Sequence, residues 1–258
     1  SNLTRFLRSH GATSLAELQQ RSITDIEWFW DAVLRDLDIR FHRPYTRVVD
    51  LARGSAWPEW CVGGGLNIVA NCLDKYAGTA TDPKPALVWE GEEGQTRRLS
   101  YAELRREVSR AANALRALGL GKGDAVGVFM PMTPEIVIAM LAIIRIGGGF
   151  LPRFAGFGAQ AIVSRLADAE AKLLFTADGC QRRGKLVPMK PTADEAAAQL
   201  PTLRHVIVLK RTGADVPWQP GRDRWWHEWL AAARDESPAE PTGAEDPLMI
   251  IYTSGTTG

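Results

Sequence analysis

The strongest constraint on the fold is a regular alternation of strand-like and helix-like segments between residues 100 and 209. Short apolar runs typical of buried strands occur at 125–130, 150–154, 173–177 and 205–209. Segments with helical periodicity lie between and beside them, at 100–118, 133–146, 159–169 and 193–200. Alternating strands and helices are joined by right-handed crossovers. We therefore predict an α/β fold with a mostly parallel sheet covered by helices on both faces.

Local signals define the elements in front of this region. Ser100 and Glu103 form a capping-box pattern that predicts a helix start, and Thr24 with Glu27 repeats the pattern near the N-terminus. Residues 86–90 and 96–99 predict a strand pair around a Gly-containing turn. We expect an N-terminal helical and irregular segment over residues 1–75, followed by an α/β subdomain over residues 76–258.

Composition excludes several classes of function. The 258 residues include 31 Lys+Arg and 30 Asp+Glu. With this near-zero net charge and no basic block, we do not expect the basic surface that binds nucleic acids or anionic membranes. The longest apolar stretch is interrupted by Pro and charged residues, so we expect no membrane span and a cytoplasmic protein. Three cysteines and four scattered histidines do not form a zinc pattern or a disulfide framework, and we assign no metal to them. The oligomeric state is not predicted.

Ligands of parallel sheets bind where strands end, and three such junctions could hold phosphate. The first, Gly179-Cys-Gln-Arg-Arg-Gly184-Lys185-Leu186, resembles a P-loop but has Leu where a Mg²⁺-binding Ser or Thr is needed. We interpret it as a chance near-match.

The second junction is Gly156-Phe-Gly158-Ala-Gln-Ala161, which fits a dinucleotide-binding fingerprint. Asp178 follows 22 residues after Gly156, at the spacing of a ribose-binding carboxylate. A tight strand-to-helix turn explains the glycines equally well, so both interpretations stay open.

The third junction is the run Thr253-Ser-Gly-Thr-Thr-Gly258, which comes after the apolar segment 248–252. Glycines allow close backbone approach, and hydroxyls and amides donate to phosphate oxygens. Without further information, an ordinary Ser/Thr/Gly surface turn is the simpler interpretation.

A resemblance favours the phosphate loop. Tyr252-Thr-Ser-Gly-Thr-Thr-Gly258 resembles the signature of the AMP-forming adenylating superfamily. Further landmarks of its acetyl/propionyl-CoA synthetase branch follow in order from Trp60: 60–67, 71–74, 123–135, 154–157, 176–179 and 206–226. The resemblance covers nearly all of the chain beyond residue 60, which is far more specific than one motif.

The resemblance implies two groups of site residues. The ATP β/γ-phosphates and pyrophosphate would be held by the loop of Thr253, Ser254, Gly255, Thr256, Thr257 and Gly258. Coenzyme A would be bound by Phe154, Ala155, Gly156, Arg182 and Lys185.

This sequence departs from the family at three places, two of them among these site residues. Lys185 stands where Arg is expected, which keeps the charge but loses bidentate geometry. Ala155 replaces a Gly, and Gly158-Ala159 replaces a Ser/Ala-Pro pair. Apart from the resemblance, the basic residues at 182 and 183 also fit a solvated turn.

The resemblance implies that the chain is the N-terminal part of an AMP-forming carboxylate–CoA ligase acting on a short-chain acid. ATP, Mg²⁺ and coenzyme A would be its cofactors and substrates. We expect no catalytic or metal-binding residue within the chain and no turnover by it alone, because the catalytic Lys and the Mg²⁺ carboxylate follow downstream in the family. The alternatives are a Rossmann-like NAD(P)-binding protein and a stand-alone nucleotide- or CoA-binding module.

Overall fold

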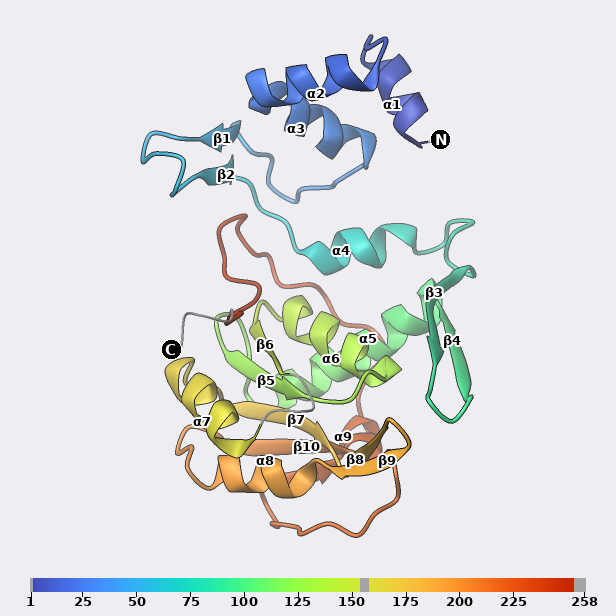
Figure 1. Cartoon of the computed structure of the whole chain (residues 1–258), viewed down its shortest axis with the longest axis vertical. Helices are drawn as coiled ribbons and strands as arrows, with labels where there is room; N and C mark the ends of the chain where they lie inside the picture. The colour runs from blue at the N-terminus through green and yellow to red at the C-terminus, as the bar shows by residue number, and fades with distance from the viewer. Residues whose placement is uncertain (1, 154–157, 253–258) are drawn as a thin grey trace. The chain divides into compact units, whose positions relative to one another are not determined.

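The computed structural model describes residues 2–153 and 158–252 (Figure 1). Its contacts divide into two compact units, which we call the N-terminal unit and the α/β unit. The N-terminal unit comprises Ser1–Asn67 with Pro241–Asp246, and the α/β unit comprises Ile68–Glu240 with Pro247–Gly258. The boundary near residue 75 remains a prediction.

The N-terminal unit combines three helices with one strand pair. Its elements are α1 (Asn2–Ser9), α2 (Leu15–Thr24), α3 (Ile26–Asp36), β1 (Arg47–Asp50) and β2 (Glu59–Val62). The strands pair antiparallel. A small core of Phe6, Leu18 and Ala32 joins the helices.

The start of the third helix differs from the prediction. Asp25 rather than Thr24 is the N-cap, and its side chain accepts a hydrogen bond from the backbone N–H of Trp28 at 3.1 Å. Thr24 instead ends α2, where its hydroxyl donates to the carbonyls of Gln20 and Arg21. Adjacent Thr and Asp can both cap a helix, and the sequence pattern did not distinguish them.

The α/β unit is built on a five-stranded parallel sheet in the order β11-β10-β7-β5-β6. Its strands are β5 (Ala125–Phe129), β6 (Gly149–Arg153), β7 (Leu173–Ala177), β10 (His205–Leu209) and β11 (Asp223–Trp225). The helices are α4 (Ile68–Cys72), α5 (Tyr101–Ala117), α6 (Pro134–Arg145), α7 (Ala159–Asp168), α8 (Lys190–Ala197) and α9 (Trp226–Leu230), with a 3₁₀ turn at Asp74–Tyr76.

Helices cover both faces of the sheet, as predicted. Successive residues of a strand point to opposite faces, so each strand supplies two cores. In β5, Val126 and Val128 pack into the core formed with α5 and α6, whereas Ala125 and Phe129 pack into the core formed with α7 and α8. The capping box of Ser100 and Glu103 is present at the start of α5.

In the described part of the α/β unit, two hairpins lie outside the parallel sheet. The predicted pair is β3 (Pro85–Glu90) with β4 (Thr96–Ser100). The second hairpin, β8 (Gly179–Arg182) with β9 (Lys185–Pro188), was not predicted, since these residues lack the alternation of a half-buried strand.

The segment near the C-terminus is less regular than predicted. The expected strand over 248–252 is reduced to one parallel bridge between Met249 and Phe150, at the edge of β6. The N–H of Phe150 donates to the carbonyl of Leu248 at 3.2 Å, and that of Ile250 to the carbonyl of Phe150 at 3.1 Å. The segment therefore runs beside β6 in the same direction.

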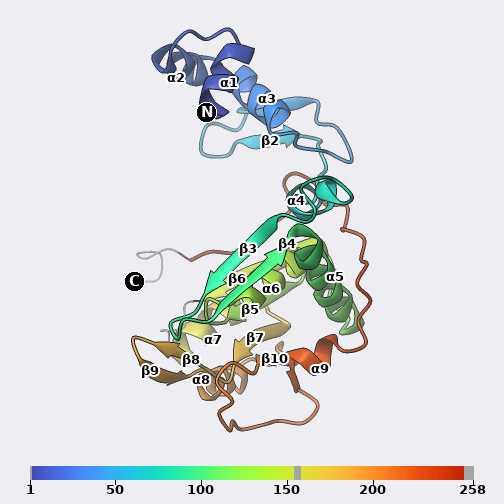
Figure 2. The same ribbon diagram turned by 90° about the vertical axis from the view of Figure 1, so that its right-hand side faces the viewer.

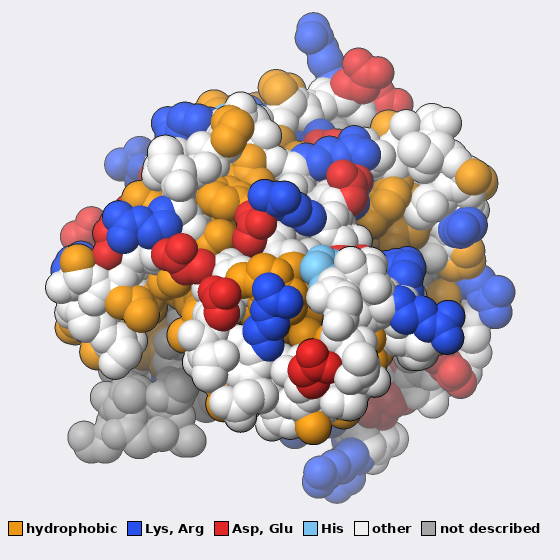
Figure 3. Space-filling model, turned by 90° about the horizontal axis from the view of Figure 1, so that it is seen from above, with side chains coloured by type: hydrophobic (Ala, Val, Ile, Leu, Met, Phe, Trp, Pro, Cys, Tyr) orange, Lys and Arg blue, Asp and Glu red, His pale blue; other side chains and the backbone are white. Residues whose placement is uncertain are grey.

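Charges are mixed on the face drawn in Figure 3, where Lys and Arg side chains alternate with Asp and Glu among the described residues. Within residues 2–153 and 158–252, no helix is long and apolar enough to cross a membrane.

We expect His205 to make the stability of the fold depend on pH. Burial, together with the positive charges of Arg224 and Arg204, lowers the pKa of His205 from its usual 6.5. The pKa of His205 is thus lower in the folded protein than in the unfolded chain, where it is about 6.5. As the pH drops below about 6.5 the unfolded chain binds the proton first, so the free energy of unfolding falls. We expect His205→Gln to remove the part of this pH dependence that His205 causes. Urea unfolding between pH 7.5 and 5 measures it; parallel stability curves for the two proteins would contradict the assignment.

Candidate ligand-binding edge of the sheet

The carboxyl ends of the parallel strands meet at one edge of the sheet, where ligands of such sheets bind. Phe154, Ala155 and Gly156, and the whole loop Thr253–Gly258, lie outside the described residues. The described residues that precede them, Arg153 and Tyr252, end two segments that run parallel and side by side. The tyrosine is fixed against α7: its hydroxyl donates to the Asp168 carboxylate, and the Arg165 guanidinium lies 5.5 Å from its ring centre.

Arg182 and Lys185 are brought together by the β8–β9 hairpin. They are directly opposite each other in the ladder, on either side of the two-residue turn Arg183-Gly184. Opposite residues of an antiparallel pair place their Cβ atoms about 4.5–5.5 Å apart on one face. Two cationic side chains on this spacing can converge on one anion, which supports their pairing but does not identify the ligand.

The base of this hairpin is fixed by Asp178. This carboxylate is buried, with 1% of the residue exposed. It accepts hydrogen bonds from four backbone N–H groups at 2.7–3.1 Å: Gly179, Arg211, Thr212 and Gly213. The Asp178 carbonyl also accepts from the N–H of Met189 at 3.2 Å, at the end of β9.

This geometry overturns the dinucleotide-binding interpretation of Asp178. A ribose-binding carboxylate must present oxygen atoms to the ligand, whereas the Asp178 oxygens are turned inward and used by the chain itself. The spacing from Gly156 to Asp178 fits the fingerprint because one helix and one strand, α7 and β7, lie between them, as in a dinucleotide-binding βαβ unit.

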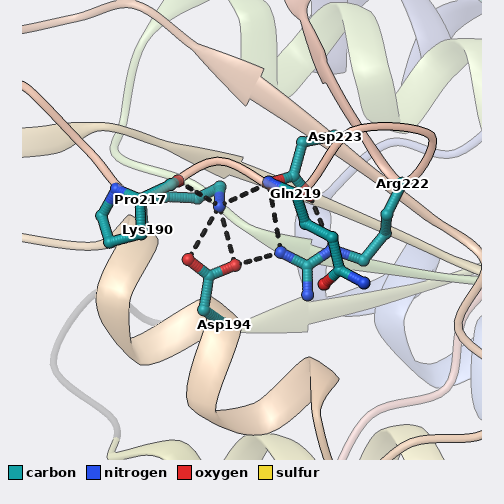
Figure 4. A network of polar contacts seen from close by, with 6 residues as sticks. All are labelled: Lys190, Asp194, Pro217, Gln219, Arg222 and Asp223. Atoms are coloured by element: carbon teal, nitrogen blue, oxygen red, sulfur yellow. Dashed lines mark hydrogen bonds and ion pairs between the residues drawn. The ribbon is translucent and has the colours of Figure 1, made fainter.

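A buried ion network follows directly after the hairpin (Figure 4). Lys190, the first residue of α8, has a fully buried side chain whose ammonium donates to Asp194 at 2.7 and 2.8 Å, to Asp223 at 2.8 Å and to the Pro217 carbonyl at 3.0 Å. Arg222 completes the network by donating to both carboxylates. Burial alone would raise the pKa of Asp223, but the hydrogen bonds from Arg222 and Lys190 outweigh it and the pKa is lowered.

The network has a structural role. Two cations and two carboxylates balance in charge, and their donors and acceptors satisfy one another. It joins the start of α8 to β11 and to the loop before it, and so anchors the chain where the hairpin ends.

A cavity of about 330 Å³ is lined in part by β8 and by the β3–β4 turn. Its lining includes Trp89, Met132, Thr133, Gln181, Arg182 and Arg211. The Arg211 guanidinium is already paired with Glu93 at 2.6 Å and lies 5.6 Å from the centre of the Trp89 ring. We assign no ligand to this cavity.

Two observations concern thiol reactivity and metal ligands among the described residues. Burial raises the pKa of the Cys180 thiol at the start of the hairpin, which disfavours the reactive thiolate. Among residues 2–153 and 158–252 no three His, Cys, Asp or Glu side chains are grouped to hold a metal ion. None of the described residues is proposed as a Mg²⁺ ligand.

Comparison with known proteins gives two adjoining family matches. Residues 74–258 match the model of the AMP-binding enzymes, and residues 15–72 match that of the acetyl-coenzyme A synthetase N-terminus. The chain belongs to the AMP-binding enzyme family. The resemblance seen in the sequence, and the α/β fold that it implied, are thereby confirmed, and nothing supports the NAD(P)-binding alternative.

Individual relatives agree with this assignment. Acetyl-coenzyme A synthetase of Mycobacterium tuberculosis H37Rv is 44% identical over 250 residues, which are 96% of this chain and 38% of that protein. The acetyl-coenzyme A synthetase of Escherichia coli K12 is 42% identical over 246 residues, 93% of this chain and 37% of that protein. The structure of acetoacetyl-CoA synthetase from Streptomyces lividans superimposes with a TM-score of 0.89 at 35% identity, covering all of this chain and 40% of that one.

The chain therefore spans a little over a third of the length of these relatives. The match runs through both units of the structure and ends in the predicted phosphate loop. The roles of Arg182 and Lys185, and of the residues outside the described ranges, remain predictions.

Proposed function

We propose that this chain is the N-terminal portion of an AMP-forming carboxylate–CoA ligase. In the proposed reaction a short-chain carboxylate attacks the α-phosphorus of ATP, giving acyl-AMP and pyrophosphate. The CoA thiolate then attacks the acyl carbonyl and AMP leaves, so that a thioester is formed. The observation that carries the proposal is the continuous match to acetyl-CoA synthetases over 96% of the chain.

The residues proposed for ATP are those of the loop Thr253–Gly258. Its hydroxyls and backbone amides would donate to the β- and γ-phosphate oxygens, and its glycines would allow the backbone to approach them. The loop would thereby stabilise the leaving pyrophosphate. Mg²⁺, when bound, would neutralise phosphate charge, and none of the described residues is proposed as its ligand.

The residues proposed for coenzyme A are Phe154, Ala155, Gly156, Arg182 and Lys185. The last two support the proposal by geometry, because the hairpin holds both cations on one face. They would bind phosphate groups of CoA and so act on the thioester-forming step rather than on adenylation. A short-chain acid is proposed because the relatives are named for acetyl and acetoacetyl groups.

A binding measurement tests the CoA site. We expect Arg182→Ala to weaken CoA binding to the 258-residue chain about tenfold or more, because a charge-assisted hydrogen bond contributes about 1.5–3 kcal/mol and tenfold corresponds to about 1.4 kcal/mol. CoA-induced shifts of the backbone amides in a ¹⁵N spectrum give the dissociation constant even when binding is weak. Arg98→Ala, an exposed arginine on β4, is the matched control for overall charge.

Two results would contradict this assignment. One is unchanged CoA affinity in Arg182→Ala. The other is saturable binding of NADH with shifts at the same amides, which would favour a general nucleotide-binding module.

A further inference from the structure

The β8–β9 hairpin needs support from outside itself. It is a two-stranded unit separate from the five-stranded sheet, and such a pair is marginal alone. Its turn has positive φ at both central residues, 54° at Arg183 and 71° at Gly184. This conformation suits a two-residue hairpin, but it is sterically unfavourable for Arg.

Glu92 supplies that support from a different hairpin. It lies in the turn of β3–β4, and its carboxylate accepts from the N–H of Arg183 at 3.2 Å and from the N–H of Gly184 at 3.5 Å. The two turns meet at their tips although 91 residues separate them in sequence, and Figure 2 shows the end of β3–β4 beside β8 and β9.

The β3–β4 turn is itself fixed in place. The Arg211 guanidinium donates to Glu93 at 2.6 Å and to Gln95 at 3.1 Å. Its hydrogen bond also lowers the pKa of the Glu93 carboxyl. The backbone N–H of Arg211 donates to Asp178, which anchors the base of β8–β9. The carboxylate of Glu92 is thus held at a defined position relative to the hairpin that it contacts.

We propose that Glu92 is a positioning residue for the CoA site: by binding the two turn amides, it holds the β8–β9 turn so that Arg182 and Lys185 converge on one phosphate group. This inference rests on the proposed function. Glu92 touches no substrate in this account and acts only through the hairpin. The base of the hairpin is fixed by Asp178 and the Lys190 network, and its tip is fixed by Glu92.

Glu92 has two opposite effects on CoA binding: it positions the β8–β9 turn, and its negative charge opposes phosphate binding. Glu92 lines the same cavity as Arg182, so its negative charge reduces the positive potential available to a phosphate there. If this charge were its only influence, removing it would tighten CoA binding. If hydrogen bonding to the turn dominates, removing the whole side chain weakens binding most, whereas an isosteric amide, whose single carbonyl oxygen can accept from only one of the two turn N–H groups, weakens it less.

Two variants of the 258-residue chain separate these effects. We expect Glu92→Ala to weaken CoA binding about tenfold, equivalent to ~1.4 kcal/mol, and Glu92→Gln, which loses one of the two hydrogen bonds, to weaken it by a smaller factor of about threefold. Glu90→Ala is the matched control, since it removes a carboxylate from the same hairpin that is not a partner of the turn amides. Amide shifts on titration with CoA give all four dissociation constants.

The outcomes are distinguishable. CoA binding by Glu92→Ala that equals or exceeds that of the wild type would overturn the inference. So would global unfolding of Glu92→Ala in the ¹⁵N spectrum, because the role of this exposed residue would then be structural. Failure of the wild-type chain to bind CoA would instead overturn the proposed CoA site at Arg182 and Lys185, on which the inference rests.

Discussion

Asp178→Ala is expected to lower the free energy of unfolding by at least about 3 kcal/mol, because each buried donor left without a partner costs about 1–3 kcal/mol. Four backbone N–H groups lose their acceptor in this variant. Some of them lie near the surface, where water can replace the carboxylate, so the full sum is not expected.

Urea unfolding followed by circular dichroism measures this effect. Asp215→Ala is the matched control, since it removes an exposed carboxylate from the same loop after β10 and should change stability by less than about 0.5 kcal/mol. A stable Asp178→Ala protein that had lost a nucleotide-binding activity would contradict the structural role and restore the dinucleotide-binding interpretation.

Lys190→Met is expected to cost about 3–5 kcal/mol, because it removes one partner of a buried ion network and leaves carboxylate charge uncompensated. The Lys190 and Asp223 side chains are both fully buried. Arg222 still contacts both carboxylates in the variant, so the network would keep one cation against two anions.

A surface ion pair provides the comparison for Lys190. Lys172 pairs with Asp124 at 2.5 Å, but its side chain is 45% exposed. Lys172→Met should therefore cost no more than about 1 kcal/mol. Equal losses of stability in the two methionine variants, read from denaturant midpoints at unchanged m-value, would mean that the buried network is not a major anchor of α8.

Strands and helices of the α/β unit could be predicted because their signals are local. β7 and β10 have the predicted bounds, and α7 differs from its predicted end by one residue. In these elements the spacing of apolar residues directly indicates whether both faces of a strand, or one side of a helix, are buried.

The β8–β9 hairpin could not be predicted in this way. Its strands are four residues each and its turn contains Arg at a left-handed position, so neither alternation nor a typical turn pair marks it. Its turn and the residue before it make hydrogen bonds with distant residues: Glu92 contacts Arg183, and Arg211 contacts Asp178. Long-range contacts of this kind leave no periodic pattern in the sequence.

The residues of the candidate site also differ in how far the sequence could predict them. Arg182 and Lys185 were chosen by resemblance, and the structure adds that they oppose each other across a turn. The spacing of Asp178 left a ribose-binding role open, and its burial shows a structural role instead. The Asp178 carboxylate is bound by the backbone of residues 211–213. These residues lie outside the segment from Gly156 to Asp178, so the spacing within that segment could not indicate the burial.

Acid-dependent exchange of pyrophosphate into ATP tests the central claim most directly. In a chimera, residues 1–258 replace the matched part of the M. tuberculosis acetyl-coenzyme A synthetase, to which they are 44% identical. We predict acetate- or propionate-dependent exchange by the chimera and none above a no-acid blank by the 258-residue chain alone. A folded chimera without exchange on any short-chain acid, while the mycobacterial enzyme is active in the same assay, would contradict the account, as would exchange by the chain alone.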